Sequence, residues 1–136
     1  MPMSEKDLSF VKSHLADRYF DRHGQPFSDL HEWVRRLEDS AYTRVAEATL
    51  ADGTWVSTVW RGLNQNWGVG PPLIFETMVF LSKVGPLSEI ETARYATEEE
   101  ALAGHHRIVR KWATRIGRTL ARERRHLAAL AEVEAR

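Results

Sequence analysis

The chain has 136 residues, of which 43% are apolar, and its 19 basic side chains balance 19 acidic ones; this suits a single domain over residues 1–136 and excludes a disordered chain. Because the chain has no cysteine, disulfides and thiolate-bound zinc are excluded, and a reducing compartment fits the composition. No apolar run approaches the roughly 18–20 residues that cross a bilayer, and the first ten residues lack a signal-peptide layout, so we expect a soluble cytoplasmic protein without membrane contact.

Charge is distributed unevenly along the chain. Residues 1–100 hold 10 basic and 16 acidic side chains, whereas residues 101–136 hold 9 and 3. Such asymmetry is found in proteins that bind nucleic acid, but it equally allows the two parts of one chain to attract each other. Both interpretations stay open from charge alone.

Residues 1–40 predict a helical lead-in. A first helix begins at Ser4, which acidic residues follow, and ends near His23–Gly24. A second helix covers residues 29–38, with Asp29 as its cap. Each has an apolar face, formed by Leu8, Val11, Leu15 and Tyr19 in the first helix and by Leu30, Trp33, Val34 and Leu37 in the second.

Two β-rich runs follow, at residues 41–50 and Thr54–Arg61. They flank Asp52–Gly53, which is a strong hairpin signal. If these two residues form a two-residue turn, counting along the strands sets Arg44 opposite Arg61.

Further strands are expected at Leu73–Leu81 and Glu91–Ala96. The third strand alternates, but both of its sides are largely apolar, whereas a sheet with one wet face would alternate more cleanly. We therefore expect helices over one sheet face and additional cover, most simply a partner subunit, over part of the other.

The chain after residue 96 predicts one long helix. Thr97 followed by three glutamates forms a capping box at its start, and good helix formers continue almost to Arg136. Gly117 favours a bend or break, or a tail that packs on another chain. The apolar face consists of Leu102, His105, Val109, Trp112, Ile116 and Leu120, with Leu127 and Leu130 beyond.

Together these elements predict an α+β fold with a four-stranded, mainly antiparallel sheet over residues 41–96. Two helices precede the sheet, and the long C-terminal helix packs across one of its faces. We expect the protein to form a homodimer or a higher oligomer.

Several phrases of the sequence, spread over roughly residues 41–110, resemble a small family of hypothetical proteins associated with bacteriophage and prophage genomes. They are Val56–Trp60, Gly62-Leu63, Pro71–Phe80, Arg94–Thr97 and Ala103–His105. In the family pattern Gly62-Leu63 continues with Asp-His, whereas this chain continues with Asn64-Gln65. If that acid and imidazole are catalytic, this chain should lack the activity. The resemblance implies a phage-type origin, and thus the cytoplasm of a bacterial host, but little about mechanism.

A charged cluster is expected on the sheet. Opposed Arg44 and Arg61 would repel, and a nearby carboxylate would relieve the repulsion. If Val59 faces Glu76 across the next strand pair, Glu76 lies diagonal to Arg61. The cluster would then hold an anion or polar ligand between the arginines. Alternatively, it is a structural ion pair at the rim of the sheet.

The loop Asn64–Pro72 favours a binding role. Its 9 residues exceed a tight hairpin connection, two glycines permit unusual backbone angles, and two prolines stiffen its exit. Asn64, Trp67 and the loop N–H groups would present a polar and aromatic platform to a ligand. Alternatively, Trp67 folds back onto the core.

His105 falls on the apolar face of the long helix, with His106 beside it. An imidazole there would act as a base or ligand, or would be a buried structural group with Tyr95 and Glu76 as neighbours. No histidine spacing typical of a metal site occurs, so we expect neither a metal nor a cofactor.

Eight cations and one acid lie between residues 107 and 125. Binding of a phosphate backbone through Arg115, Arg118 and Arg122 is one interpretation. The steps of three and four between these cations also describe a solvated helix face.

Three hypotheses about function follow. The leading one is a non-enzymatic, oligomeric accessory protein of phage or prophage type that binds a host protein or a small ligand through the Asn64–Pro72 loop and the sheet edge. A small-molecule enzyme would require Glu76 and His105 to converge in a pocket that solvent reaches. A nucleic-acid binder would use the C-terminal helix. The sequence assigns no catalytic residue.

Overall fold

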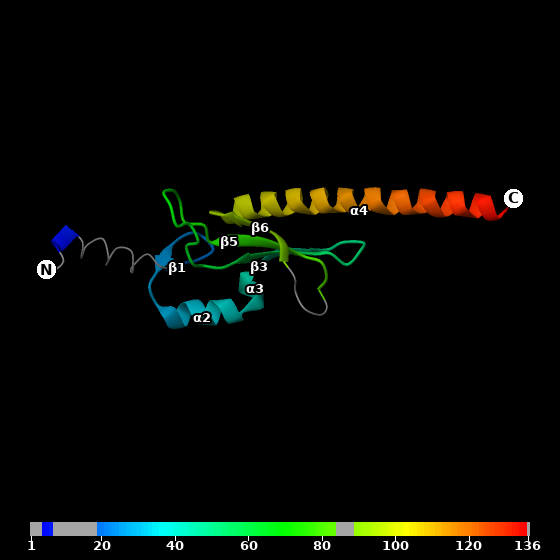
Figure 1. The fold of residues 1–136 in the computed structure, drawn as a ribbon. Helices are drawn as coiled ribbons and strands as arrows, with labels where there is room; N and C mark the ends of the chain where they lie inside the picture. The colour runs from blue at the N-terminus through cyan, green and yellow to red at the C-terminus, as the bar shows by residue number, and fades with distance from the viewer. Residues whose placement is uncertain (1–3, 7–18, 84–88, 136) are drawn as a thin grey trace.

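In a computed structural model of the chain, residues 4–6, 19–83 and 89–135 are described (Figure 1). The strands β3, β4, β5 and β6 form one antiparallel sheet in that order, and β1 and β2 form a second, two-stranded sheet. The predicted α+β class is confirmed. The elements are β1 (Tyr19–Phe20), β2 (Pro26–Phe27), α2 (Leu30–Glu38), α3 (Ser40–Thr43), β3 (Arg44–Thr49), β4 (Trp55–Trp60), β5 (Phe75–Phe80), β6 (Glu89–Tyr95) and α4 (Glu98–Glu134).

The predicted first helix falls mostly on residues 7–18, which lie outside the described residues, but its predicted end is wrong. Tyr19 and Phe20 are extended and pair with Phe27 and Pro26. The intervening turn reverses the chain because the Asp21 carboxylate accepts the backbone N–H groups of His23 (2.8 Å) and Gln25 (2.9 Å). The strand β2 follows this turn and leads into α2.

The second helix is confirmed, with Asp29 accepting the N–H groups of His31 and Glu32 at its start. Trp33 and Leu37 pack against the core, whereas Leu30 and Val34 are exposed. Asp39 then caps α3, so the residues just before β3 are helical instead of extended as predicted.

The hairpin between β3 and β4 has a three-residue loop, not the predicted two-residue turn. The Leu50 N–H donates to the Thr54 carbonyl (2.8 Å) and the Gly53 N–H to the Leu50 carbonyl (2.9 Å). Gly53, at φ +91°, is the left-handed residue that ends such a loop. The predicted register is therefore wrong by one residue, and Thr49 pairs with Trp55. A bulge between Arg44 and Ala46 then sets Arg44 opposite Val59 instead of opposite Arg61.

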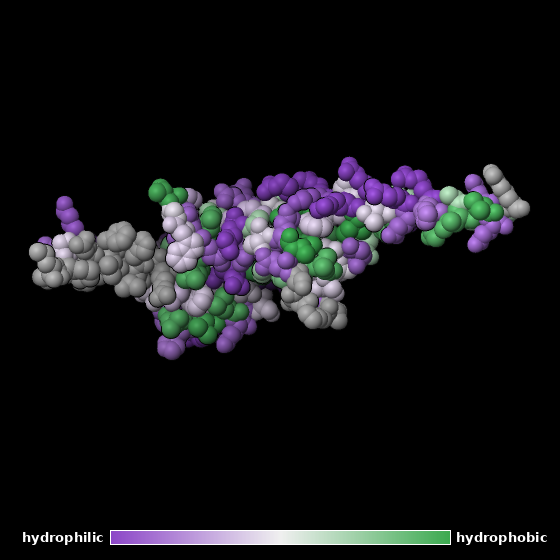
Figure 2. Space-filling model, in the orientation of Figure 1, coloured by the Kyte–Doolittle hydropathy of each residue, from purple (hydrophilic) through white to green (hydrophobic). Residues whose placement is uncertain are grey.

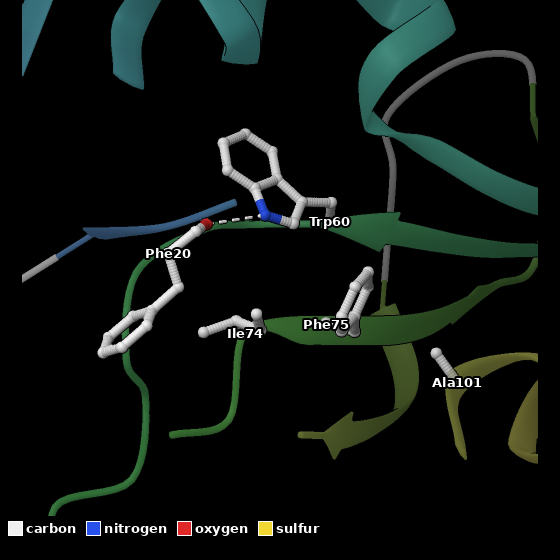
Figure 3. Close-up of a cluster of buried hydrophobic side chains, with 5 residues drawn as sticks. All are labelled: Phe20, Trp60, Ile74, Phe75 and Ala101. Atoms are coloured by element: carbon white, nitrogen blue, oxygen red, sulfur yellow. Dashed lines mark hydrogen bonds between the residues drawn. The ribbon is translucent and has the colours of Figure 1, made fainter. Parts of the chain in front are cut away.

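The helix α4 lies over one face of the sheet (Figure 1). Its Ile108 packs with Val56 and Val79, and its Ala101 belongs to the cluster around Trp60 that Figure 3 shows. The Trp60 indole N–H donates to the Phe20 carbonyl (2.9 Å), which ties β1 to this cluster. Because side chains alternate along a strand, the sheet residues on this face are Val56, Thr58, Trp60, Phe75, Thr77 and Val79.

The opposite face of the sheet carries Ser57, Val59, Glu76, Met78 and Phe80. The register places Val59 opposite Glu76, which is the pairing that the expected charged cluster assumed. Ser57, Glu76 and Phe80 are buried within the single chain, although they lie on the side away from α4. Water is therefore excluded from these three residues without a second copy of the chain.

The helix α4 begins as predicted and shows no break at Gly117, which was one of the two alternatives expected there. The Thr97 side chain accepts the Glu100 N–H (3.1 Å), which completes the expected cap. Helical structure then runs through Gly117 to Glu134. Buried positions lie one residue away from part of the predicted stripe: Ala101 and Gly104 are buried, whereas Leu102 is 38% exposed. From residue 117 to residue 135 every side chain is exposed.

Candidate binding loop

Backbone hydrogen bonds fix the base of the Asn64–Pro72 loop. The Arg61 and Gly62 N–H groups donate to the Ile74 carbonyl (2.8 and 3.2 Å), and the Phe20 N–H donates to the Gly62 carbonyl (2.8 Å). Gly62 has φ +70°, and a Cβ there would lie 2.2 Å from the buried Trp60 ring. This position therefore requires glycine, and the loop leaves the sheet at a defined angle.

Asparagine side chains hold the interior of the loop. The Asn64 Oδ1 accepts the N–H groups of Asn66 (2.8 Å) and Leu73 (3.2 Å), which joins the two ends of the loop. The Asn66 Oδ1 accepts the Gly68 N–H (3.0 Å), and its Nδ2 donates to the Pro71 carbonyl (3.0 Å). Two amide side chains thus replace the ladder that a regular hairpin would have.

The tip of this loop is apolar and exposed. Trp67 is 98% exposed and Val69 is 106% exposed, and both extend from the framework that Asn64 and Asn66 hold. Figure 2 shows an apolar projection where Figure 1 places this loop. The predicted alternative, in which Trp67 folds back onto the core, is wrong.

The predicted charged cluster contains Arg61 and Glu76 but not Arg44. The Glu76 carboxylate lies 3.5 Å from Arg61 Nε and 3.9 Å from Arg94 Nε. Arg44 instead lies 3.7 Å from Glu47. The bulge in β3 explains this, because it moves Arg44 away from the row in which Arg61 was expected. The arginine that faces Glu76 across the sheet is Arg94, on the neighbouring strand β6, which the sequence analysis did not select.

Glu76 and His105 lie on opposite faces of the sheet, which corrects the prediction that they are neighbours. The Thr58 hydroxyl forms hydrogen bonds with the Thr77 hydroxyl (2.6 Å) and with His105 Nδ1 (2.7 Å), so Thr77 points toward α4. Glu76 precedes Thr77 in β5 and therefore points away from α4. The two groups do not share a pocket.

The other predicted neighbour of His105, Tyr95, does lie against α4. A Cβ added to Gly104 would be 2.2 Å from the Tyr95 ring, so the missing side chain lets the ring pack on the helix. His105 itself is 3% exposed. Burial, together with the neighbouring His106, lowers the pKa of His105 below its ordinary value. Burial thus favours the neutral form of this imidazole, which forms a hydrogen bond with Thr58 in the core.

The predicted phosphate-binding arginines differ in their surroundings. Arg115 lies over the Trp112 ring, 4.9 Å from its centroid. Arg118 and Arg122 are exposed on the part of α4 beyond Ile116. Lys111 forms an ion pair with Glu91, which also accepts the Trp112 indole N–H (2.7 Å). The first turns of the basic stretch therefore hold the helix on the sheet, and the later cations face solvent.

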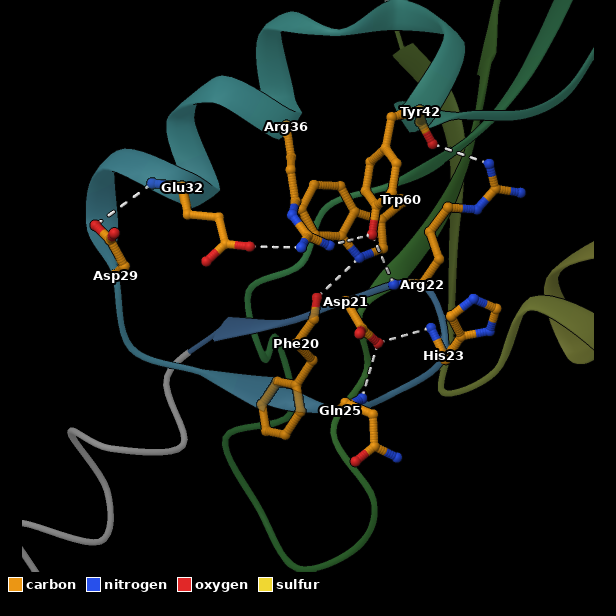
Figure 4. Close-up of polar contacts among 10 residues, drawn as sticks. All are labelled: Phe20, Asp21, Arg22, His23, Gln25, Asp29, Glu32, Arg36, Tyr42 and Trp60. Atoms are coloured by element: carbon orange, nitrogen blue, oxygen red, sulfur yellow. Dashed lines mark hydrogen bonds and ion pairs between the residues drawn. The ribbon is translucent and has the colours of Figure 1, made fainter.

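Sequence reasoning missed a polar network that joins the N-terminal elements to α4. Figure 4 shows the Tyr42 hydroxyl accepting the Arg22 backbone N–H (3.1 Å) and Arg36 Nη1 (2.7 Å). The Arg22 guanidinium also donates to the Tyr42 carbonyl (3.0 Å) and pairs with Glu98 in the first turn of α4. An acid at a helix start signals a cap, but nothing local in the sequence indicates an arginine 76 residues away.

Within residues 4–6, 19–83 and 89–135, no group of three or more metal-binding side chains is close enough to hold an ion. No helix in the described part is long and apolar enough to cross a membrane. Comparisons of the chain with family models, with characterised proteins and with solved structures find no match to any of them. The geometry of the chain therefore carries the functional argument.

Proposed function

We propose that this chain is a non-enzymatic binding protein that docks on a partner protein through the tip of the Asn64–Pro72 loop. The observation that carries the proposal is a fully exposed tryptophan on a loop that its own asparagine side chains keep ordered. Tryptophan is enriched among the few residues that supply most of the binding energy at protein interfaces.

Burial of the Trp67 side chain in a partner would supply a substantial binding free energy. An aromatic side chain buries about 150–250 Å², and at about 25 cal/mol per Å² its burial in a partner would contribute about 4–6 kcal/mol before the costs of association. The hydrogen bonds of Asn64 and Asn66 reduce one of those costs, because the loop need not be ordered on binding.

The proposal extends to the class of partner and to self-association. The resemblance to a phage and prophage family makes a bacterial host protein the partner class that we propose. We also propose that the protein acts as an oligomer, because α4 exposes apolar side chains beyond Ile116. Two linked copies would present two loops, and avidity would then strengthen binding to a partner that has two sites.

Photo-crosslinking tests the docking site in bacterial cells. A photoreactive amino acid at Val69 should form an adduct with one partner protein, and the same group at Ala121, which is exposed on α4, should not. The purified partner then serves for affinity measurements. Trp67→Ala should weaken its binding by about 30- to 1000-fold, as loss of a dominant interface residue does. Trp67→Ala should leave thermal unfolding unchanged, because the side chain is 98% exposed.

Two further variants sharpen this test. Leu30→Ala removes another exposed apolar side chain, 51% exposed and located in α2, and should leave the affinity unchanged. Asn66→Ala retains Trp67 but removes the hydrogen bonds to Gly68 and Pro71, and should weaken binding by a smaller factor than Trp67→Ala. Equal affinity of Trp67→Ala and the unaltered protein would contradict the proposed docking site.

A further inference from the structure

The helix α4 carries an apolar stripe on the part that extends past the sheet. We name it the C-terminal stripe; it consists of Leu120, Glu123, Leu127 and Leu130, is apolar except at Glu123, and follows the buried Ile116 at successive steps of four, three, four and three residues. This alternation averages 3.5 residues, which is the repeat of a coiled-coil seam. Leu127 is 64% exposed and Leu130 is 48% exposed. Figure 2 shows apolar surface near this end of the helix.

The stripe continues the side of α4 that faces the sheet. Ile108 is 7% exposed against β4 and β5, and Ile116, two steps of four residues further on, is 9% exposed. Leu120 is the next step in the same series. A helix seated on the stripe would therefore lie on the sheet side of α4, just past the end of the sheet (Figure 1).

The side chains around the stripe suit insertion of a facing helix. Arg122, Glu123, His126 and Leu127 surround a shallow hollow on the helix surface. A side chain from a second helix can fit such a hollow as a knob fits a hole. Arg118 and Arg125, two and five residues from Leu120, fall on the outer side of the helix, where an added helix would leave them in water.

Charge along the helix distinguishes the two orientations in which a second copy could bind. Residues 115–125 hold five arginines and one glutamate, whereas residues 126–135 hold Glu132 and Glu134 and no basic residue other than His126. A parallel pair would set the basic parts side by side and bring the second copy's sheet onto the space of the first. An antiparallel pair lays the basic part of each helix along the acidic part of the other.

We propose that residues 117–135 of α4 bind the same residues of a second copy as an antiparallel, two-fold helix pair. The stripe is then the dimer seam of the oligomer proposed above, and this inference deepens that part of the proposed function. The shared segment is about 28 Å long, from a rise of 1.5 Å per residue. The two-fold axis then passes near His126, at the middle of this segment, and the seam residues Glu123 and Leu127 lie on either side of it.

Sedimentation velocity and a matched pair of variants test the seam. The unaltered chain should sediment as a dimer that dissociates on dilution. Leu127→Glu combined with Leu130→Glu should raise the dimer dissociation constant at least about a hundredfold, because charges would enter the seam. Ala121→Glu adds the same charge five residues from Ile116, on the outer side of the helix, and should leave the dimer intact. Circular dichroism of all three proteins checks that the fold persists.

Spin labels test the orientation. Because the chain has no cysteine, Ala135→Cys gives a single labelling site. In the antiparallel pair the two labels should lie about 30 Å apart, and in a parallel pair about 10 Å apart. A dimer with the short distance would overturn the proposed orientation. A Leu127→Glu, Leu130→Glu variant that still dimerises would overturn the proposed seam.

A chain that stays monomeric at every concentration would also overturn the proposal, whether or not it then binds nucleic acid, anionic vesicles or another protein through α4. The loop experiment distinguishes this failure from a failure of the docking function. The adduct at Val69 and the effect of Trp67→Ala depend on the loop, and a monomer would still show both.

Discussion

From Glu98 to Ile116 the helix α4 lies over the four-stranded sheet, whereas from Gly117 to Ala135 all of its side chains are exposed. The two halves have similar helix-forming residues, and one glycine lies in each. Their environments differ because of length: strands of six or seven residues span about 20 Å, and a helix of 37 residues spans about 55 Å. The comparison shows that burial in this protein depends on where the sheet ends rather than on the composition of the helix.

The largest expected difference between the halves comes from removing one apolar side chain in each. Ile108→Ala should lower the free energy of unfolding by about 2–4 kcal/mol, because it leaves a cavity against Val56 and Val79. Leu127→Ala should change it by less than about 0.5 kcal/mol. Urea denaturation, at concentrations where the chain is monomeric, measures both. Equal losses would contradict the proposed division of the helix.

A methyl group at Gly104, the glycine in the sheet-covered half of α4, should destabilise the fold. A Cβ at Gly104 would meet the Tyr95 ring and hydroxyl at 2.2 Å, so the ring must move out of its place on the core. We expect Gly104→Ala to lower the free energy of unfolding by about 1–3 kcal/mol, as overpacked positions do. An unchanged urea midpoint would show that Tyr95 can move without loss.

The same substitution at Gly117, in the exposed half of α4, should have the opposite effect on stability. No heavy atom lies within 4 Å of a Cβ added at Gly117. Alanine is favoured over glycine inside a helix by up to about 1 kcal/mol. Gly117→Ala should therefore slow amide hydrogen exchange in the second half of α4 and leave exchange in the sheet unchanged. Faster exchange beyond residue 117 would contradict an unbroken helix.

The smallest expected effect is a dependence of folding stability on pH through His105, which is buried in the sheet-covered half of α4. Burial lowers the pKa of His105 in the folded chain. At a pH just below the ordinary value of 6.5, the unfolded chain therefore binds a proton that the folded chain does not bind. The stability is fully present above this value and falls as the pH is lowered through it. Urea denaturation between pH 7.5 and about pH 5 should show the decline.

A pair of histidine variants isolates the group. His105→Gln should reduce the dependence of stability on pH in this range, whereas His126→Gln, in the exposed half, should not. Hydrogen bonds from Lys111 and Trp112 lower the pKa of Glu91, so its contribution is lost at more acidic pH, below the ordinary value of 4.5. An identical pH profile for His105→Gln and the unaltered chain would contradict the assignment.

Local signals in the sequence were sufficient for helix starts. Asp29 and Thr97 each cap a helix as predicted, because a cap depends on a few adjacent residues. The pairing of Tyr19 and Phe20 with residues after the Asp21 turn was not predictable from an apolar face that also suited a helix. The Asp52–Gly53 signal is shared by two- and three-residue loops, and the choice between them moved the register by one residue.

The features of the candidate site likewise divide into those that the local sequence indicates and those that depend on pairing between distant parts of the chain. The loop was predictable from its length, glycines and prolines, whereas the sequence left open whether Trp67 projects from the loop or folds back onto the core. The pairing of Glu76 with Val59, which the sequence analysis assumed, is present, but the partner Arg94 depends on the register of a further strand. The relation of Glu76 to His105 depended on which sheet face α4 covers, which alternation along one strand does not determine.

The uninterrupted course of α4 has a mechanical consequence. The Asn64–Pro72 loop projects near the start of this helix, and the C-terminal stripe lies at its other end (Figure 1). A continuous helix resists bending over this distance, so two copies joined at the far end would form a stiff rod with one tryptophan tip at each extremity. The fixed distance between the two loop tips would then favour pairs of target sites that lie at the same separation.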